Sequence, residues 1–127
     1  MVPLHQFQAG TDGAYPTSLI RSNWKLYGTT TSGGGSTVCP YGGCGTVFQM
    51  TPASGGARSQ RVLYAFRGAA DGGSPNSLVE MNGSLYGMTG CYTNTVFQLS
   101  PSASETGGWN SSLFTPLRAL PRAFRLL

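Results

Sequence analysis

Two stretches of this chain are copies of one another, and this repeat constrains the fold more than any other feature. Residues 4–30 align with residues 63–89 without a gap, at a spacing of 59 residues, and 12 of the 27 aligned positions are identical. The identities include Leu-Tyr-Gly at 26–28 and 85–87, and Asp-Gly at 12–13 and 71–72. An internal repeat of this length is typical of proteins that place several similar units in series.

The repeat continues after an interruption. Thr46–Pro52 matches Thr95–Pro101 at a spacing of 49 residues, so the second copy lacks ten residues of the glycine-rich stretch 31–45. Insertions are tolerated best in surface loops, which make few packing contacts. We therefore expect residues 31–45 to form a surface loop between two structural elements.

Each unit is expected to contain four short strands. The first three are Ser77–Met81, Ser84–Thr89 and Thr95–Leu99, read from the second unit, and the fourth is Arg61–Phe66, read from the end of the first unit. Asn82-Gly83 lies between two apolar runs, which is typical of a two-residue hairpin turn with two positive φ angles. Asn23-Trp24 occupies this place in the first unit and fits such a turn less well.

Composition favours strands over helices. The chain has 19 glycines and 8 prolines, and only 9% of its residues are charged, so good helix formers never recur over a long window. The run Val62–Phe66 is apolar at successive positions, which predicts a strand covered on both faces. We predict an all-β fold of antiparallel four-stranded blades, a partial β-propeller of about two blades. A β-sandwich is the alternative.

The repeat divides the chain into segments. Residues 1–116 are assigned to tandem β-repeats, and 117–127 match no part of the unit. Within the repeats, 1–7 form a partial unit, 8–66 unit one and 67–114 a shortened unit two. A third copy is expected to begin near Trp109, although no Asp-Gly-x-x-Pro follows it. The chain is thus expected to begin inside a unit.

The ordered blocks of the repeat resemble the GloVer tandem repeat of bacterial proteins. Four blocks carry the resemblance: Leu26–Thr30, Gly45–Pro52, Val62–Phe66 and Leu85–Gly87. It implies propeller-like β structure and a place at the cell surface or outside the cell, since such proteins carry several copies in series and are often exported and anchored. The resemblance implies no catalytic or ligand-binding residue in this chain. The second unit departs from the pattern at Asn94, where the first has Gly45.

The distribution of charged and apolar residues argues against a nucleic-acid partner and against a membrane span. The net charge of +4 comes largely from Arg118, Arg122 and Arg125 near the C-terminus, and no basic stripe interleaved with aromatic residues accompanies them, so nucleic acid is not expected to bind. No apolar run approaches the ~20 residues of a membrane helix. The first residues, 1–6, have neither the basic nor the apolar region of a signal peptide.

The cysteines suggest a disulfide. Cys39 and Cys44 lie five residues apart in the glycine-rich loop and can close a small disulfide loop in an oxidising compartment. Three unpaired thiols, with Cys91 in the corresponding loop of unit two, are the alternative. A zinc site would need about two more ligands, and His5 is the single histidine.

The Asp-Gly-x-x-Pro motif is expected to form a turn in each unit. A repeated carboxylate could bind calcium, but each loop offers one, and an aspartate that accepts backbone N–H groups explains the motif with fewer ligands. The expected turn residues are Asp12, Gly13, Pro16, Asp71, Gly72 and Pro75.

Candidates for catalysis are few. Asp, Glu and His number five in all, and His5 is replaced by Tyr64 in the second unit, which favours a surface position on a strand over a catalytic base. The recurring aromatic residues are expected in the core rather than in a sugar-binding groove; they are Tyr27, Phe48, Tyr86 and Phe97.

The sequence therefore predicts no catalytic residue, no cofactor and no metal. The leading hypothesis is a non-enzymatic repeat module with a structural or binding role. The alternatives are a carbohydrate-binding module, with Trp24 as the residue to test, and a fragment of a propeller enzyme. Two blades leave open sheet faces and edges, so the chain is expected to be marginally stable or to associate with itself or with further repeats.

Overall fold

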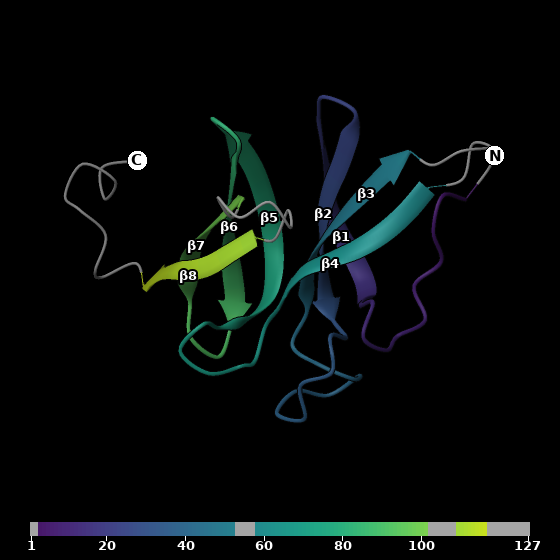
Figure 1. The fold of residues 1–127 in the computed structure, drawn as a ribbon. Coiled ribbons are helices and arrows are strands. Elements are labelled where there is room, and N and C mark those ends of the chain that lie inside the picture. Colours follow the sequence, from purple (N-terminus) through teal and green to yellow (C-terminus); the bar gives the residue numbers. More distant parts are fainter. Residues whose placement is uncertain (1–2, 53–57, 102–108, 117–127) are drawn as a thin grey trace.

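The strands form two separate sheets in the computed structural model, which describes residues 3–52, 58–101 and 109–116. The first sheet holds β1 (Ala14–Ser22), β2 (Lys25–Ser32), β3 (Thr46–Pro52) and β4 (Arg58–Ala65). The second holds β5 (Gly73–Met81), β6 (Ser84–Cys91), β7 (Thr95–Pro101) and β8 (Trp109–Pro116). In each sheet the strands lie side by side in chain order, and every neighbouring pair is antiparallel (Figure 1). The expectation of an all-β fold is confirmed. The segment 117–127, which matches no part of the repeat, lies outside the described residues.

The two sheets repeat one another in register as well as in order. Leu19 pairs with Gly28 in the first sheet, and Leu78 pairs with Gly87 in the second. Both first hairpins also carry a register shift two residues into the pairing, between Pro16 and Ser18 and between Pro75 and Ser77. The internal repeat in the sequence is therefore a repeat in hydrogen-bonded structure.

The turn between β5 and β6 has the geometry expected from Asn-Gly. Asn82 and Gly83 both have positive φ, 53° and 85°. In the first sheet Asn23 has a φ of 56°, and Trp24 is not among the positive-φ residues. The less suitable sequence of the first unit thus gives a different turn between strands of the same register.

The glycine of Leu-Tyr-Gly makes room for a phenylalanine. A Cβ atom on Gly28 would lie 2.5 Å from Cζ of Phe48, and one on Gly87 would lie 2.5 Å from Cζ of Phe97. Each phenylalanine is nearly fully buried and pairs directly with its glycine on the neighbouring strand. The motif is conserved between the units because any side chain at the glycine would displace this ring.

The threonine of Leu-Tyr-Gly-x-Thr joins β2 to β3 and β6 to β7. The Thr46 N–H donates to Oγ1 of Thr30 at 3.0 Å, and the Thr95 N–H donates to Oγ1 of Thr89 at 2.9 Å. All four threonines are buried. A buried N–H without a partner costs roughly 1–3 kcal/mol, which explains why this threonine recurs.

The sheets meet along β5. The strands β1 and β2 of the first sheet pack against β5 of the second, and β4 continues into β5 through residues 66–72 (Figure 1). The core between them contains residues of both sheets and of the glycine-rich loop: Tyr27, Cys39, Cys44, Val47, Phe66, Leu78, Leu85, Phe97 and Leu99.

The glycine-rich loop 31–45 differs from the expectation of few packing contacts. Cys39 and Cys44 are buried in the core, and the loop is held by backbone hydrogen bonds such as Gly45 N–H to Gly33 O at 2.9 Å. Its carbonyls also accept from the segment between the sheets and from β5, since Phe66 N–H donates to Gly45 O at 2.9 Å and Ser74 N–H to Cys44 O at 2.7 Å. The insertion therefore helps to join the sheets.

Candidate functional site

Each sheet has two different faces, because successive residues of a strand point to opposite sides. We name one the leucine face: Leu19, Leu26, Phe48 and Met50 in the first sheet, and Leu78, Leu85, Phe97 and Leu99 in the second. We name the other the tyrosine face: Ile20, Tyr27, Thr29 and Val47 in the first sheet, and Val79, Tyr86, Met88 and Val96 in the second. The repeat makes the two leucine faces equivalent, and likewise the two tyrosine faces.

The interface inside the chain joins unlike faces. Tyr27 and Val47 of the first sheet are buried in one core with Leu78, Leu85 and Phe97 of the second, with Ile20 packed at its edge. The tyrosine face of the first sheet therefore covers the leucine face of the second. This arrangement uses one leucine face and one tyrosine face and leaves one of each open.

The open leucine face lies on the first sheet. Leu19 is 57% exposed, whereas its equivalent Leu78 in the covered face is 5% exposed. Pro16 is likewise exposed, whereas Pro75 is fully buried. The difference arises from what lies above each face, because the residues themselves are identical.

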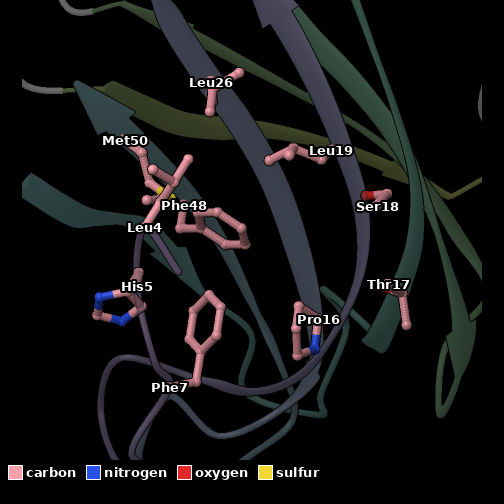
Figure 2. Close-up of a pocket in the computed structure, with 10 residues that line it drawn as sticks. All are labelled: Leu4, His5, Phe7, Pro16, Thr17, Ser18, Leu19, Leu26, Phe48 and Met50. Atoms are coloured by element: carbon pink, nitrogen blue, oxygen red, sulfur yellow. The ribbon is translucent and has the colours of Figure 1, made fainter. Parts of the chain in front are cut away.

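A hollow of about 370 Å³ lies over this open face. Figure 2 shows its lining, in which the side chains of the strands are flanked by those of the N-terminal segment. The lining residues are Leu4, His5, Phe7, Pro16, Thr17, Ser18, Leu19, Leu26, Phe48 and Met50. The lining is mostly apolar, which is typical of a surface that binds another apolar surface rather than a charged small molecule.

The N-terminal segment covers one end of the open face. Residues 3–8 form no strand, although Leu4–Phe7 matches Leu63–Phe66 at the end of β4 in sequence. Phe7 nevertheless packs edge-on against Phe48, with ring centroids 5.1 Å apart. Phe66 packs in the same manner on Phe97 at 5.2 Å. The segment thus reproduces one contact of the internal interface.

The open tyrosine face lies on the second sheet. Val79 is 55% exposed and Met88 51%, and Tyr86 and Val96 are partly buried. Their equivalents in the first sheet include Thr29 and Val47, which have no exposed surface. Of the recurring aromatic residues expected in the core, Tyr27 and Phe97 are buried between the sheets, and Tyr86 is half-buried on this open face. Phe48 is buried on the leucine face of the first sheet, where it packs against Phe7.

The turn aspartates bind the backbone of their own turns. The Gln8 N–H donates to both carboxylate oxygens of Asp12, at 3.1 and 3.2 Å. The Arg67 N–H donates to Oδ2 of Asp71 at 2.9 Å, and the Ala69 N–H donates to its Oδ1 at 3.2 Å. Gly13 and Gly72 follow with φ angles of 109° and 82°, which an L-residue adopts only with strain. The carboxylates therefore hold the turns.

The aspartate pKa values follow from these contacts. Burial by itself raises the pKa of the Asp71 carboxyl, but the hydrogen bonds from Arg67, Tyr64 and Ala69 outweigh it, so the pKa lies below its usual value. Burial also raises the pKa of the Asp12 carboxyl, but hydrogen bonds from Gln8 and His5 outweigh this effect, so that pKa too lies below its usual value. Both carboxylates are charged at neutral pH and are stabilised in that form.

His5 and Tyr64 make equivalent contacts with the aspartates of the two turns. Nε2 of His5 lies 3.1 Å from Oδ2 of Asp12, and the Tyr64 hydroxyl donates to Oδ2 of Asp71 at 2.8 Å. His5 is half-buried and lies outside the strands, so its expected position on a strand surface was wrong. A His-Asp pair can serve acid–base catalysis, but here a tyrosine replaces the histidine with the same geometry, which identifies a structural contact.

The cysteines occupy two different environments. Cys39 and Cys44 form a disulfide, and their Cα atoms lie 5.1 Å apart. A Cβ atom on Gly68 would meet both sulfur atoms, at 3.0 and 2.7 Å, so the disulfide packs directly on the segment between the sheets. Cys91 is a free and exposed thiol. In the part of the chain that the structure describes, no three His, Cys, Asp or Glu residues gather into a group that could hold a metal ion.

Trp24 lies in a turn and is not one of the residues that define the two open faces. It is 84% exposed at the turn between β1 and β2 and does not line the hollow over the leucine face. A second hollow, of about 600 Å³, adjoins the first beside Tyr15 and Tyr41, whose rings meet edge-on at 5.9 Å. No helix long and apolar enough to cross a membrane occurs within residues 3–52, 58–101 and 109–116.

Comparison of the chain with protein-family models, with curated proteins and with solved structures found no match.

Proposed function

We propose that this chain is a non-enzymatic repeat module, in which each sheet is one blade of a propeller-like array and serves to pack against neighbouring blades. The observation that carries the proposal is the use of unlike faces in the interface between the two sheets. A tyrosine face covers a leucine face, so every unit has one face for the unit before it and one for the unit after it. Contacts of this kind extend indefinitely, as in other repeat proteins.

The chemistry of the open faces supports this role. Aliphatic and aromatic side chains dominate both, and the carboxylates of the repeated motif are engaged within their own turns. The module would act in an exported bacterial protein of the GloVer type, at the cell surface or outside the cell. The Cys39–Cys44 disulfide supports that location, since disulfides persist in oxidising compartments.

The test is to add one unit. Insertion of a second copy of residues 8–66 directly after Phe7 keeps the register of the repeat, because Phe7 and Phe66 are equivalent positions. The tyrosine face of the inserted unit would then cover the open leucine face. We expect the longer chain to unfold in one transition at a higher urea midpoint than the original chain, because it contains two interfaces in place of one.

A matched insertion provides the control. The inserted copy carries Ile20→Asp, which places a charge on the face that would meet Leu19 and Leu26. This control is expected to lose the increase in midpoint. Equal midpoints for the original chain and the unmodified insertion would show that the units do not pack as a series, and would overturn the proposal.

A further inference from the structure

The open leucine face of the first sheet and the open tyrosine face of the second are the two halves of one interface. The same two kinds of face are already joined inside the chain, where Tyr27 and Val47 cover Leu78, Leu85 and Phe97. The strand residues that would form a second such interface are present on one molecule, whereas the buried Cys39–Cys44 disulfide of the internal core has no equivalent in the shorter loop of the second sheet. We propose that the chain associates head to tail with itself, the open tyrosine face of one copy covering the open leucine face of the next.

The leucine half of this interface matches its template closely. Leu19, Leu26 and Phe48 are identical in type to Leu78, Leu85 and Phe97, and Met50 replaces Leu99. Methionine and leucine have similar volumes and exchange readily in apolar contacts. Phe7 already covers Phe48, and the hollow of about 370 Å³ beside it is the space that a second copy would fill.

The tyrosine half matches in the same way. Val79, Tyr86 and Val96 stand where Ile20, Tyr27 and Val47 stand in the first sheet. On the strands, the marked difference is Met88, which is exposed where the first sheet has the buried Thr29. A flexible methionine adapts its shape to an apolar surface, so the exchange retains the character of the contact.

The geometry of the contact decides the kind of assembly. The two surfaces are different, so the contact is heterologous, and each added copy again presents one open face of each kind. Such contacts produce closed rings when the rotation per copy divides a full turn, and filaments otherwise. Propellers close with about four to eight blades, which corresponds to rings of about two to four copies of this chain.

The proposal commits to a second copy of this chain and rests on the proposed function, since it takes the interface between units as its template. The two can fail separately. A chain that stays monomeric while the three-unit insertion is stabilised would remove this inference and leave the repeat module in place.

The test uses two single variants of the full chain. Leu19→Asp places a charge on the open leucine face, and Val79→Asp places one on the open tyrosine face. Both residues are more than half exposed, so the variants should retain the fold of the single chain. Sedimentation velocity over a wide range of concentrations is expected to show association of the unmodified chain and monomers for each variant alone.

Mixing the variants separates this arrangement from other forms of association. Leu19→Asp retains an intact tyrosine face and Val79→Asp an intact leucine face, so an equimolar mixture is expected to form a dimer that grows no further. Trp24→Asp, which charges an exposed apolar side chain outside both faces, is expected to associate like the unmodified chain.

Three results would overturn the proposal: an unmodified chain that is monomeric throughout, association that only Leu19→Asp abolishes, and a mixture that remains monomeric. Leu19→Ser and Val79→Ser form a second pair, to be used in the same mixture if circular dichroism shows that either aspartate variant is unfolded. Association that only Leu19→Asp abolishes would indicate that two leucine faces meet each other.

Discussion

The two leucine faces carry nearly the same residues in different surroundings. Leu78 and Leu85 lie beneath the tyrosine face of the first sheet and are almost fully buried, whereas Leu19 is more than half exposed and Leu26 is partly so. The comparison teaches that the exposure of these equivalent leucines depends on what lies above them, whereas Phe48, which packs against Phe7, is as buried as Phe97. Substitutions at the equivalent leucines of the two sheets therefore test the contact between the sheets.

The largest difference is expected between Leu85→Ala and Leu26→Ala. Truncation of a fully buried leucine costs about 3 kcal/mol, because it loses apolar contact and leaves a cavity. The same change at the open face is expected to cost about 1 kcal/mol, because part of the side chain is already in water. Urea unfolding at a protein concentration too low for association measures both. Similar losses at the two positions would contradict the assignment of covered and open faces.

A milder pair protects this comparison against complete unfolding of the Leu85→Ala variant. Leu85→Val and Leu26→Val remove less volume, and the expected loss at Leu85 falls to about 1 kcal/mol. The order of the two positions should remain the same.

The next difference concerns the two loops between the second and third strands of each sheet. In the first, the Cys39–Cys44 disulfide packs on Gly68 between the sheets, and in the second Cys91 is free. Replacement of both disulfide cysteines by serine is expected to lower the free energy of unfolding by roughly 2 kcal/mol, since even a short cross-link restricts the unfolded chain. Unfolding without reductant measures this loss.

Cys91→Ser is the matched control for the loop comparison. An exposed substitution away from other contacts usually changes stability by less than about 0.5 kcal/mol. Treatment with dithiothreitol should reproduce the loss in the unmodified chain and have no effect on the double serine variant. A loss that dithiothreitol causes in both would refute a stabilising role of the disulfide.

Much of the fold could be predicted from local signals. Asn82-Gly83 predicts the hairpin, and the two-residue alternation along its strands predicts which residues share a face. The internal repeat predicts the same hairpin in the first unit. The ends of the strands were predicted less accurately. β5 begins at Gly73, four residues before the expected Ser77, because the strand continues through its bulge.

The sequence could not reveal which leucine face is covered. Leu26 and Leu85 are the same residue in the same motif, and their exposure depends on whether another unit lies above them. Nor could it reveal that His5 and Tyr64 make equivalent contacts, because imidazole and phenol differ as residue types and share only the ability to reach the turn carboxylate. The cysteine spacing allowed a disulfide but gave no indication of its contact with Gly68.

The turn aspartates should differ by a smaller amount. Asp71 is 3% exposed and receives hydrogen bonds from Tyr64, Arg67 and Ala69, whereas Asp12 is more exposed and receives them from Gln8 and His5. We expect Asp71→Asn to cost about 2 kcal/mol and Asp12→Asn about 1 kcal/mol, since hydrogen bonds to a charged group weaken with exposure. Urea unfolding at neutral pH checks the order, and a reversed order would contradict it.

The smallest expected effect is a difference in pH dependence between the two turns. Both aspartate pKa values are lowered by folding, so below about pH 4 the unfolded chain takes up protons that the folded chain does not, and stability falls as the pH falls. Each variant, Asp12→Asn or Asp71→Asn, should remove part of this acid loss.

The second turn alone should also respond to alkali. Burial and the hydrogen bond to Asp71 raise the pKa of Tyr64 to about 12, so between about pH 10 and 12 the unfolded chain loses a proton that the folded chain keeps, and stability falls as the pH rises. His5 occupies this place in the first turn and has no phenol to ionise. Tyr64→Phe should therefore flatten the alkaline part of the stability profile, whereas Tyr15→Phe, an exposed tyrosine beside the first turn, should leave it unchanged. Thermal unfolding from pH 8 to 12 measures both profiles, and equal flattening by the two variants would show that the Tyr64–Asp71 contact is not its source.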